Sequence, residues 1–514
     1  MPLELIAYFQ GETEGAKLCV GVTSPGDWDG DGFSELFVGE MGLPKRLLVF
    51  NGGNPPDTIP DWIVTDGWRT HMWIPDINGD GIRDFGLHKS PLNDLGMLDI
   101  YFGGSDVYTK TEPDITFTYP DDSIAGFGYR FYSGDVNGDS QNDLIVTSGS
   151  RWIPDPQAWF HIFYGGDVLD IIEDSRINIH RTEEYSSYLN GIALGDINGD
   201  GLVDYAYTMV HISDVLRKLH IILGNIPLDT LPTYIISPPY EVSTPPGNFG
   251  MCIYPLGDIN KDDYDDFALG SSDLWPCIFY GGSPFDTVPV VLGDTANADT
   301  KGTAVANVGD INDDGWDDIG VGYTALDLGN GIAYVYYGSR TIDTEADLAF
   351  PWYDAVPMAG GYFGYSIGPA GDFNGDGVDD LVISAEQKWA YQKGQVWVYA
   401  GDSTLPTPAE EVDDPFDIPR QFDVLEQNYP NPFNTSTTIR YHLSGRQSRR
   451  VELSIYNLLG QRVRVLRDRI EGGGVHSANW DGTDDNGAVV STGIYFSVFK
   501  SDGQATSKKM LLLK

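Results

Sequence analysis

The sequence has little cysteine, few basic residues and no long apolar run. Three cysteines among 514 residues, Cys19, Cys252 and Cys277, are too few for a disulfide framework, and their apolar neighbours predict small buried side chains. No apolar run approaches the ~20 residues that a membrane-spanning helix needs. The first residues, beginning Met1-Pro2, have neither the basic nor the apolar region of a signal peptide. These absences disfavour a disulfide-held scaffold and a helical membrane protein.

Basic residues are scarce mainly in the first four fifths of the chain. Lys and Arg number 31 against 76 Asp and Glu, which gives a net charge of −45. Residues 421–514 hold 12 of the basic and 9 of the acidic residues, which leaves 19 against 67, or −48, for residues 1–420. A surface this acidic argues against a nucleic-acid partner, because phosphate contacts need Lys and Arg.

The chain is rich in one motif, a nine-residue acidic loop that occurs seven times. Six copies read D-x-N-x-D-x-x-x-D and the first reads D-x-D-x-D-x-x-x-E, so oxygen-bearing side chains occupy positions one, three, five and nine. We number the copies loop one to loop seven. The predicted metal ligands are Asp27, Asp29, Asp31 and Glu35; Asp76, Asn78, Asp80 and Asp84; Asp135, Asn137, Asp139 and Asp143; Asp196, Asn198, Asp200 and Asp204; Asp258, Asn260, Asp262 and Asp266; Asp310, Asn312, Asp314 and Asp318; Asp372, Asn374, Asp376 and Asp380.

The spacing of these oxygens fits a hard divalent cation. Calcium takes six to eight oxygen ligands at about 2.3–2.6 Å, and alternate side chains of a tight loop can turn to one point. Glycine at position six permits the sharp turn, and five copies have it. An EF-hand would need its closing Glu at position twelve, where the last copy has Ile383 within an apolar run. We therefore predict up to seven structural Ca²⁺ ions.

Two copies depart from the pattern at position six. The third loop has Ser140 there and the fifth has Asp263, and Asp tolerates a left-handed conformation better than Ser. We expect the third loop to bind a cation most weakly. The fifth loop also carries Lys261 at position four and extra carboxylates at Asp263 and Asp265, which leaves its occupancy open.

The loops recur at spacings of 49, 59, 61, 62, 52 and 62 residues, which is the period of a propeller or an array. Each repeat reads as a strand entering the loop, a very apolar strand leaving it, a strand ending in a Gly-Gly turn and a weaker fourth strand. We predict an all-β fold with a seven-bladed β-propeller over residues 1–401. The last repeat lacks a fourth strand, and we expect residues 3–8 to supply it and close the ring.

The remainder of the chain changes in composition. Residues 402–427 are rich in proline and acidic residues and are predicted to form an extended linker. Residues 428–514 contain short alternating or apolar segments separated by turns, a pattern typical of a small β-sandwich.

The repeats resemble FG-GAP repeats, which build the seven-bladed propeller of integrin α subunits. The resemblance rests on Phe-Gly at 127–128, 249–250 and 363–364 together with the D-x-N-G-D-G-x-x-D loops, and it covers about residues 1–401. It implies that each calcium loop joins the first two strands of a blade on one face. Several loops lack the Phe-Gly pair, for example the one preceded by Trp73-Ile74-Pro75.

The C-terminal segment resembles a type IX secretion, type A sorting domain. The matching segments are Q-N-Y-P-N-P-F-N at 427–434, I-Y-N-L-L-G-Q at 455–461, H-S-A-N-W-D-G at 476–482, G-I-Y-F at 493–496 and K-K-M-L-L-L at 508–513. The resemblance implies an immunoglobulin-like sandwich that directs export to the surface of a Bacteroidetes-type bacterium. Such export normally follows a signal peptide, so we expect the chain to be a mature form or to lack an upstream segment.

Some residues imitate catalytic motifs. Gly364 to Gly368 fits G-x-S-x-G, but a strand continues there, whereas a nucleophile elbow needs a strand-to-helix turn, so Ser366 is not predicted to be catalytic. The eight histidines form no zinc-binding spacing. Paired glycosidase carboxylates at ~5–9 Å are not legible from a sequence and stay an alternative.

The loops between second and third strands fall on the face opposite the predicted metals. They carry the candidate ligand-binding residues Arg151, Trp152, Trp275, Trp389 and Tyr391. The aromatic rings among them either stack on a sugar or protein partner or pack inward as part of the blade. We predict a monomeric, secreted or surface-displayed, calcium-binding protein that binds a protein or glycan and is not an enzyme. The alternatives are a propeller polysaccharide lyase or glycosidase, and a remnant whose activity lay upstream.

Overall fold

The computed structural model describes residues 3–12, 16–42, 45–65, 68–89, 96–118, 127–128, 130–149, 158–166, 169–179, 185–186, 191–211, 217–226, 231–238, 249–250, 252–271, 274–293, 304–324, 330–351, 361–386, 393–405, 424–425, 433, 436–443, 449–458, 460–471, 474–485, 487–501 and 504–512. The chain divides into two compact units, Met1–Pro408 and Ala409–Lys514. This division falls inside the predicted linker of residues 402–427.

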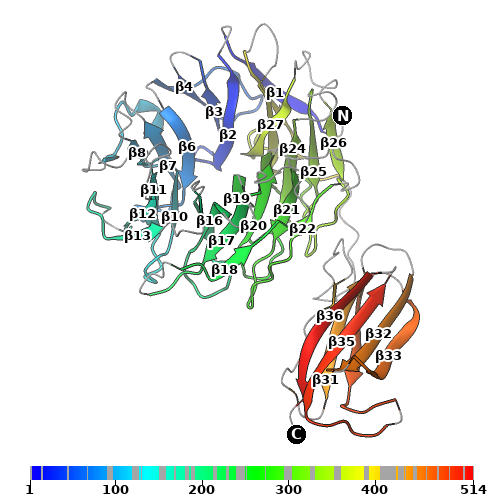
Figure 1. The fold of residues 1–514 in the computed structure, drawn as a ribbon. Coiled ribbons are helices and arrows are strands. Elements are labelled where there is room, and N and C mark those ends of the chain that lie inside the picture. The colour runs from blue at the N-terminus through cyan, green and yellow to red at the C-terminus, as the bar shows by residue number, and fades with distance from the viewer. Residues whose placement is uncertain are drawn as a thin grey trace. The chain divides into compact units, whose positions relative to one another are not determined.

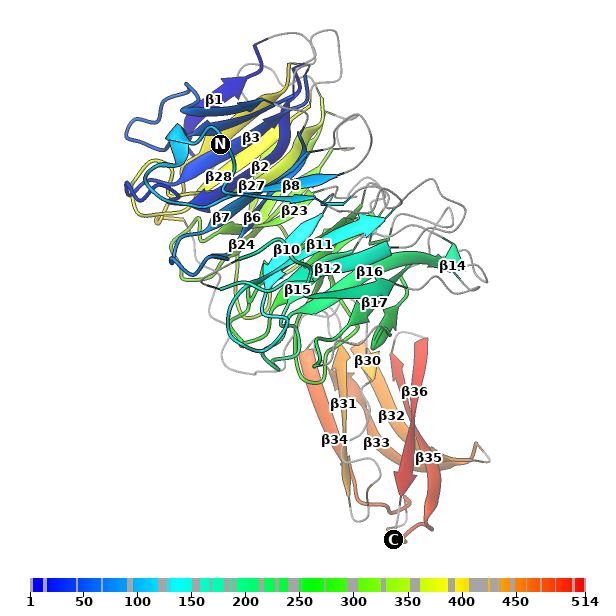
Figure 2. The same cartoon turned by 90° about the vertical axis from the view of Figure 1, so that its left-hand side faces the viewer.

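The first unit consists of short strands in seven antiparallel sheets (Figures 1 and 2). Its strands are β1 (Leu5–Gln10), β2 (Leu18–Gly26), β3 (Glu35–Glu40), β4 (Arg46–Phe50), β5 (Trp62–Thr65), β6 (Trp68–Ile74), β7 (Asp84–Lys89), β8 (Met97–Tyr101), β9 (Ile115–Thr118), β10 (Phe131–Gly134), β11 (Asp143–Gly149), β12 (Ala158–Phe163), β13 (Ser175–Ile179), β14 (Tyr185–Ser186), β15 (Ile192–Gly195), β16 (Asp204–His211), β17 (Arg217–Ile222), β18 (Tyr234–Ile236), β19 (Cys252–Gly257), β20 (Asp266–Ser271), β21 (Leu274–Phe279), β22 (Val290–Val291), β23 (Ala304–Gly309), β24 (Asp318–Tyr323), β25 (Ile332–Tyr336), β26 (Leu348–Pro351), β27 (Phe363–Gly371), β28 (Asp380–Ala385) and β29 (Gln395–Tyr399).

Each sheet is one blade. The blades are β2–β5, β6–β9, β10–β13, β14–β18, β19–β22, β23–β26, and β27–β29 with β1. The predicted seven-bladed all-β propeller is confirmed. In the fourth blade both β14 and β15 pair with β16, so this sheet has five strands among the described residues.

The first strands of the blades contact one another in a closed circle. Strand β2 contacts β6, and contacts continue through β10, β15, β19, β23 and β27, which contacts β2 again. Strand β1 pairs antiparallel with β29, from Leu5 opposite Tyr399 to Gln10 opposite Gln395. The seventh sheet therefore combines residues from both ends of the ring, with Leu5–Gln10 in the place for which residues 3–8 were predicted.

The second strand of each blade is the most deeply buried. Strands β3, β24 and β28 are buried at every residue, because one face packs on each neighbouring blade. Sequences such as Leu381-Val382-Ile383 fit this position, since a strand covered on both faces needs no polar alternation. The core therefore lies between the blades.

The Phe-Gly pairs belong to these inter-blade contacts. Phe363 is fully buried, and Gly364 has φ of +79°, a left-handed conformation. A Cβ added at Gly322 of the preceding blade would lie 1.9 Å from the Gly364 carbonyl oxygen, so the two backbones touch. Phe127 and Phe249 are likewise buried, and the glycines that follow them also have positive φ.

The second unit is a β-sandwich. Its strands are β30 (Val424–Leu425), β31 (Thr437–Leu443), β32 (Arg449–Asn457), β33 (Arg462–Glu471), β34 (Gly474–Trp480), β35 (Gly493–Ser501) and β36 (Gln504–Leu512). One sheet has the order β30-β31-β34 and the other β33-β32-β35-β36. Tyr441, Trp480 and Met510 belong to the apolar core that both sheets share, as expected for an immunoglobulin-like sandwich.

Helix is almost absent from the described residues, where one short 3₁₀ turn, η1 (Val107–Thr109), occurs. None of the described segments forms a helix with the length and apolar character needed to cross a bilayer.

Candidate metal centres

The seven acidic loops connect the first and second strands of the blades and share one hydrogen-bond plan. In every loop the position-one carboxylate accepts a hydrogen bond from the backbone N–H of position six, at 2.6–3.0 Å. The position-five carboxylate accepts one from the N–H of position seven, at 2.8–3.1 Å. The carboxylates at positions one and five therefore fold back over their own turn, while several of them, such as Asp27 and Asp31, stay exposed to solvent.

The position-nine carboxylate fastens the loop to the rest of its blade. In loops two to seven one oxygen accepts the N–H of position two at 2.8–3.1 Å. The other accepts the N–H of a glycine that follows the third strand, at 2.6–3.1 Å. These glycines are Gly103, Gly165, Gly224, Gly281, Gly338 and Gly401. The sequence shows a glycine turn after the third strand, but it does not show that the glycine N–H donates to the position-nine carboxylate.

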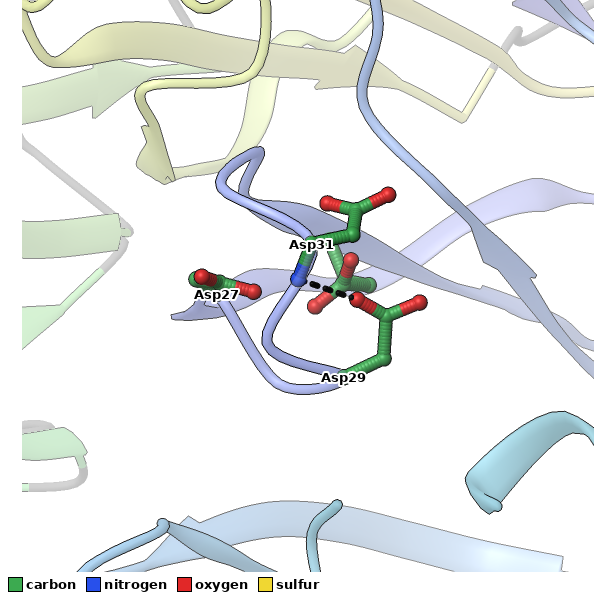
Figure 3. Close-up of side chains that lie close together, drawn as sticks. Asp27, Asp29 and Asp31 are labelled. Atoms are coloured by element: carbon green, nitrogen blue, oxygen red, sulfur yellow. Dashed lines mark hydrogen bonds between the residues drawn. The ribbon is translucent and has the colours of Figure 1, made fainter. Parts of the chain in front are cut away.

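Loop one gathers its carboxylates more closely than the other loops. Oxygens of Asp27, Asp29, Asp31 and Glu35 all lie within 4.8 Å of one another, the one such acidic group found in the described part of the chain. Figure 3 shows the three aspartates around the turn, with the Asp31 N–H donating to Asp29 at 2.9 Å. In the other loops position three is Asn, which supplies an amide oxygen and no charge.

Glu35 also differs from the six aspartates at position nine. Its Oε2 accepts the Trp28 N–H, but its Oε1 is buried with no hydrogen bond to any described residue. The Tyr108 hydroxyl is also buried without one, and burial, with Glu35 beside it, raises the pKa of that hydroxyl. A buried carboxylate oxygen without a partner is costly, and the Tyr108 hydroxyl beside Glu35 or a bound cation could each satisfy it.

Burial dominates the electrostatics of position nine. All seven side chains at this position are fully buried. Burial, opposed by the backbone N–H donors and reinforced by the loop's other carboxylates, raises the pKa of each. The pKa is about 6 for Asp143, about 7 for Asp84, Asp204 and Asp380, and about 8 for Glu35, Asp266 and Asp318.

The donor set fits a hard cation. Each loop offers four oxygen-bearing side chains, three or four of them carboxylates, and among the described residues we find no ion pair between a loop carboxylate at positions one, five or nine and a Lys or Arg. Clustered carboxylates without a basic partner repel one another, and a divalent cation would remove that repulsion.

In three loops a residue other than glycine adopts the left-handed conformation. Ser140 in loop three and Asp263 in loop five have φ of 66° and 70° at position six. Lys261 in loop five and Asp313 in loop six have φ of 54° and 55° at position four. The left-handed conformation predicted for Ser140 is therefore present, and it costs a side chain with a Cβ more than it costs glycine.

The loops also join neighbouring blades. The carbonyl of position two accepts a hydrogen bond from the next blade at five junctions, with donor-acceptor distances of 2.8–3.3 Å. In one of them Gly53 donates to Phe373 at 2.9 Å, across the junction of the last and first blades. Anything that fixes the loop conformation therefore acts on two blades.

Most of the predicted ligand-binding residues lie outside the described residues. This applies to Arg151, Trp152, Trp389 and Tyr391. Trp275 lies in β21, is half-buried and packs against the core shared by the third to fifth blades. The inward-packing alternative therefore describes Trp275.

Two groups with a catalytic appearance lie inside blades. Ser366 lies within β27, where its N–H donates to Ser384 Oγ at 3.1 Å, so no nucleophile elbow exists there. Ser148 Oγ lies 2.6 Å from Nε2 of His161, whose Nδ1 lies 2.9 Å from Glu173. Ser148 and His161 are both buried, and the Phe127 ring lies 5.3 Å from the imidazole. This arrangement satisfies buried polar groups of the third blade.

The fold and its acidic turns define a β-propeller whose blades each carry an acidic loop, followed by an immunoglobulin-like sandwich. The FG-GAP repeat family matches residues 363–399, and the FlgD Ig-like domain family matches residues 433–504. Integrin alpha-V of Gallus gallus is 26% identical over 250 residues, covering 46% of this chain and 23% of that protein. Integrin alpha-PS5 of Drosophila melanogaster is 25% identical over 330 residues, covering 59% and 30%. These findings support an FG-GAP β-propeller.

The matched part spans less than a third of the length of these integrin chains. Among solved structures, PorZ of Porphyromonas gingivalis, a surface component of the type IX secretion system, is 11% identical with a TM-score of 0.33, covering 93% of this chain and 64% of that one. The Dos1 propeller is 10% identical with a TM-score of 0.38, covering 71% and 74%. At these scores neither structure bears on function.

Proposed function

We propose that the chain is a calcium-stabilised, extracellular binding protein without catalytic activity. Its propeller binds a protein or glycan through the face opposite the acidic loops, and each loop holds one structural Ca²⁺. The observation that carries the proposal is loop one, where four carboxylates converge and a buried Glu35 oxygen lacks a donor. The resemblance to integrin alpha chains supports a binding role over an enzymatic one.

In this proposal Ca²⁺ acts on the structure and not on a reaction. The position-one, -three, -five and -nine oxygens would hold the ion, and its charge would offset the repulsion among them. Because the loops hydrogen-bond to the following blade, a fixed loop would hold two blades together. Loops three and five would bind more weakly, since both lack glycine at position six.

For the second unit we propose a delivery role. The match to an Ig-like domain supports the fold, and the motifs at 427–434 and 476–482 are those on which a type IX sorting function rests. The secretion machinery would then be a partner of this unit, and the surface of a Bacteroidetes-type bacterium its destination. Fusion of residues 409–514 to a periplasmic reporter in such a bacterium tests this, and a reporter that stays in the periplasm would refute it.

Calcium is tested by melting metal-stripped protein with and without Ca²⁺. A ligand that binds the folded state alone at 100 times its Kd stabilises it by about 2.7 kcal/mol per site. Seven loops should therefore raise the propeller's melting temperature by more than about 10 °C, with no change in the sandwich transition. Calorimetric titration should give a stoichiometry near seven; an unchanged melting temperature would rule out structural calcium.

The partner is tested with a glycan array and a panel of extracellular matrix proteins. The wild-type chain is compared with Trp389→Ala and with Ile470→Ser, an exposed site of the second unit. Binding that Trp389→Ala leaves unchanged would exclude the proposed face. Release of new reducing ends or unsaturated products from plant and algal polysaccharides would instead establish the lyase or glycosidase alternative.

A further inference from the structure

A second repeated motif lies on the same face as the acidic loops. The turns between third and fourth strands contain Asp-Thr-Ile-Pro at 57–60, Asp-Thr-Leu-Pro at 229–232 and Asp-Thr-Val-Pro at 286–289. The third blade has Asp-Ile-Ile-Glu at 170–173 in the same turn. Because consecutive strands are antiparallel, these turns lie at the same end of the blades as the turns between first and second strands. Both sets of turns therefore belong to one face.

The motif presents aliphatic side chains to solvent. In the third to fifth blades these turns hold the aliphatic rim, which we define as Ile171, Ile172, Ile226, Leu231 and Val288, with exposed fractions of 63%, 68%, 62%, 70% and 48%. Ile59 of the first blade is 71% exposed. Single exposed aliphatic residues are ordinary on a protein surface. The recurrence of Ile172, Leu231 and Val288 at the third place of the motif in three successive blades is not.

The turns hold the aliphatic residue rigidly. In the third blade the Ile172 N–H donates to Asp170 at 2.7 Å, and the Tyr164 N–H donates to Asp174 at 2.8 Å across the base of the turn. In the first blade Ile59 N–H donates to Asp57 at 2.9 Å. Because these hydrogen bonds already fix the backbone of the turn, little backbone conformational entropy is lost when a partner binds there.

The fold does not need an aliphatic residue at this place. The sixth blade builds the same turn with Glu345, whose N–H donates to Asp343 at 2.8 Å, while the Tyr337 N–H donates to Asp347 at 2.7 Å. Glu345 is exposed to solvent in the same way. The turn therefore tolerates a charged residue, and the aliphatic choice in the third to fifth blades needs a reason other than folding.

One side chain of the rim reaches the neighbouring blade. A Cβ added at Gly138 in loop three would lie 3.2 Å from Ile226 Cδ1, so this side chain of the fourth blade lies over the acidic loop of the third. The third, fourth and fifth blades follow one another in the ring. The five aliphatic side chains thus come from three consecutive blades on one face, and Ile226 reaches an acidic loop of the neighbouring blade.

The acidic residues around the rim indicate which charge a partner would carry. Its three turns, residues 164–174, 223–233 and 280–289, contain six Asp and Glu and no Lys or Arg. The corresponding turns of the second and sixth blades, which lack the aliphatic residue, contain Lys110 and Arg340. Carboxylates around an apolar centre complement a surface with Lys and Arg around apolar side chains. They would repel both the phosphates of an anionic bilayer and the acidic propeller of a second copy of this chain.

We propose that the aliphatic rim is a docking surface for a protein partner that presents aliphatic or aromatic side chains bordered by Lys and Arg. This surface lies on the face opposite the one proposed above for binding. It does not depend on whether that proposal is right, or on how many loops bind calcium.

The probe is a labelled amphipathic helical peptide of Leu and Lys, with a Leu and Glu peptide of equal hydropathy as its counterpart. Both are titrated by fluorescence anisotropy into the full-length chain in excess Ca²⁺. The Lys peptide should bind, more weakly as salt rises, and the Glu peptide should not. The triple variant Ile171→Ser, Ile172→Ser, Leu231→Ser should bind at least about tenfold more weakly, because an aliphatic side chain buried at an interface is worth about a decade in affinity.

Three controls make the result decisive. Ile470→Ser with Val489→Ser removes exposed aliphatic residues of the second unit and should leave the Kd unchanged. Arg340→Thr with Glu345→Ile extends the rim into the sixth blade and should tighten binding about threefold. Each variant must keep the wild-type melting temperature. Absence of Lys-peptide binding, equal binding by the triple variant, or rim-dependent sedimentation with phosphatidylglycerol vesicles would overturn the proposal.

Discussion

Loop one and the six loops that follow occupy the same place in their blades but solve the problem of a buried carboxylate differently. In loops two to seven, position nine is an Asp whose two oxygens each accept a backbone N–H, as Asp204 does from Ile197 and Gly224. In loop one the longer Glu35 keeps one oxygen without a donor and lies within 4.8 Å of three other carboxylates.

The difference distinguishes two roles of position nine, that of a clamp for backbone N–H groups and that of a cation ligand. In loops two to seven the ninth residue works as a backbone clamp whether or not a cation is present, because its donors belong to the blade. In loop one the ninth residue would act chiefly as a ligand of the proposed cation, since one of its oxygens accepts no backbone N–H. We expect loop one to depend most on the cation and the other loops to keep part of their structure without it.

The largest effect is expected from removing a clamp. Asp204→Ala leaves two buried N–H groups unpaired and should lower the free energy of unfolding of metal-stripped protein by about 4 kcal/mol, at about 1–3 kcal/mol for each orphaned donor. Glu35→Ala removes one hydrogen bond and should cost less than half as much under the same conditions. Urea denaturation in the absence of metal measures both. If Asp204→Ala and Glu35→Ala lost equal free energy of unfolding, position nine would not have different roles in loop four and loop one.

A smaller but more specific effect is expected from Glu35→Gln. The change keeps the shape and the Trp28 hydrogen bond but removes one of four charges, and cation affinity depends steeply on ligand charge. Calorimetric titration should show the affinity of the tightest site reduced at least about tenfold, while Asp204→Asn should leave that site unchanged. If Asp204→Asn weakened it equally, loop one would not be the tightest site.

The pH dependence sharpens the comparison further. Position-nine pKa values of about 6 to about 8 lie above the unfolded value of about 4, so the native state binds more protons than the unfolded state between these limits. The contribution of these groups to the stability of metal-stripped protein should thus be full below about pH 4 and be lost as the pH rises to 8. With saturating Ca²⁺ the trend should reverse, because the ligands bind deprotonated. Denaturation at pH 5, 6.5 and 8 measures this; a rise without metal would contradict it.

The smallest effect is expected from relieving strain in loop three. Ser140→Gly replaces a residue at φ 66° by one that adopts this conformation freely. The gain should be about 0.5 kcal/mol, the difference between the left-handed strain and the extra entropy of glycine in the unfolded chain. Asp263→Gly should gain less, because Asp tolerates this region better. Loss of stability in Ser140→Gly would show that its hydroxyl matters more than its backbone.

The seven-bladed fold was legible from the sequence because its signals are local. The acidic loops repeat with a fixed internal spacing, and hydrogen bonds from position six to position one join residues only five apart, as between Gly32 and Asp27. Turn chemistry of this kind is written in consecutive residues.

What the sequence did not reveal depends on tertiary contacts. The glycine clamp joins residues about 20 apart, such as Gly224 and Asp204, and becomes visible only when the third strand is placed beside the second. The difference between Glu35 and the aspartates looked like a conservative change. The exposure of Ile172 also could not be read from its motif, since an aliphatic residue in a turn is as readily buried. The predicted binding face remains a prediction, because four of its five residues lie outside the described residues.

The pairing of β1 with β29 joins residues that are nearly 400 positions apart, Leu5 and Tyr399. Contacts of such long sequence separation form late, since loop-closure entropy must be overcome first. During synthesis, the opening strand therefore waits without its partner until the last blade has left the ribosome. Throughout that interval the seventh sheet is incomplete and the circle of blades stays open.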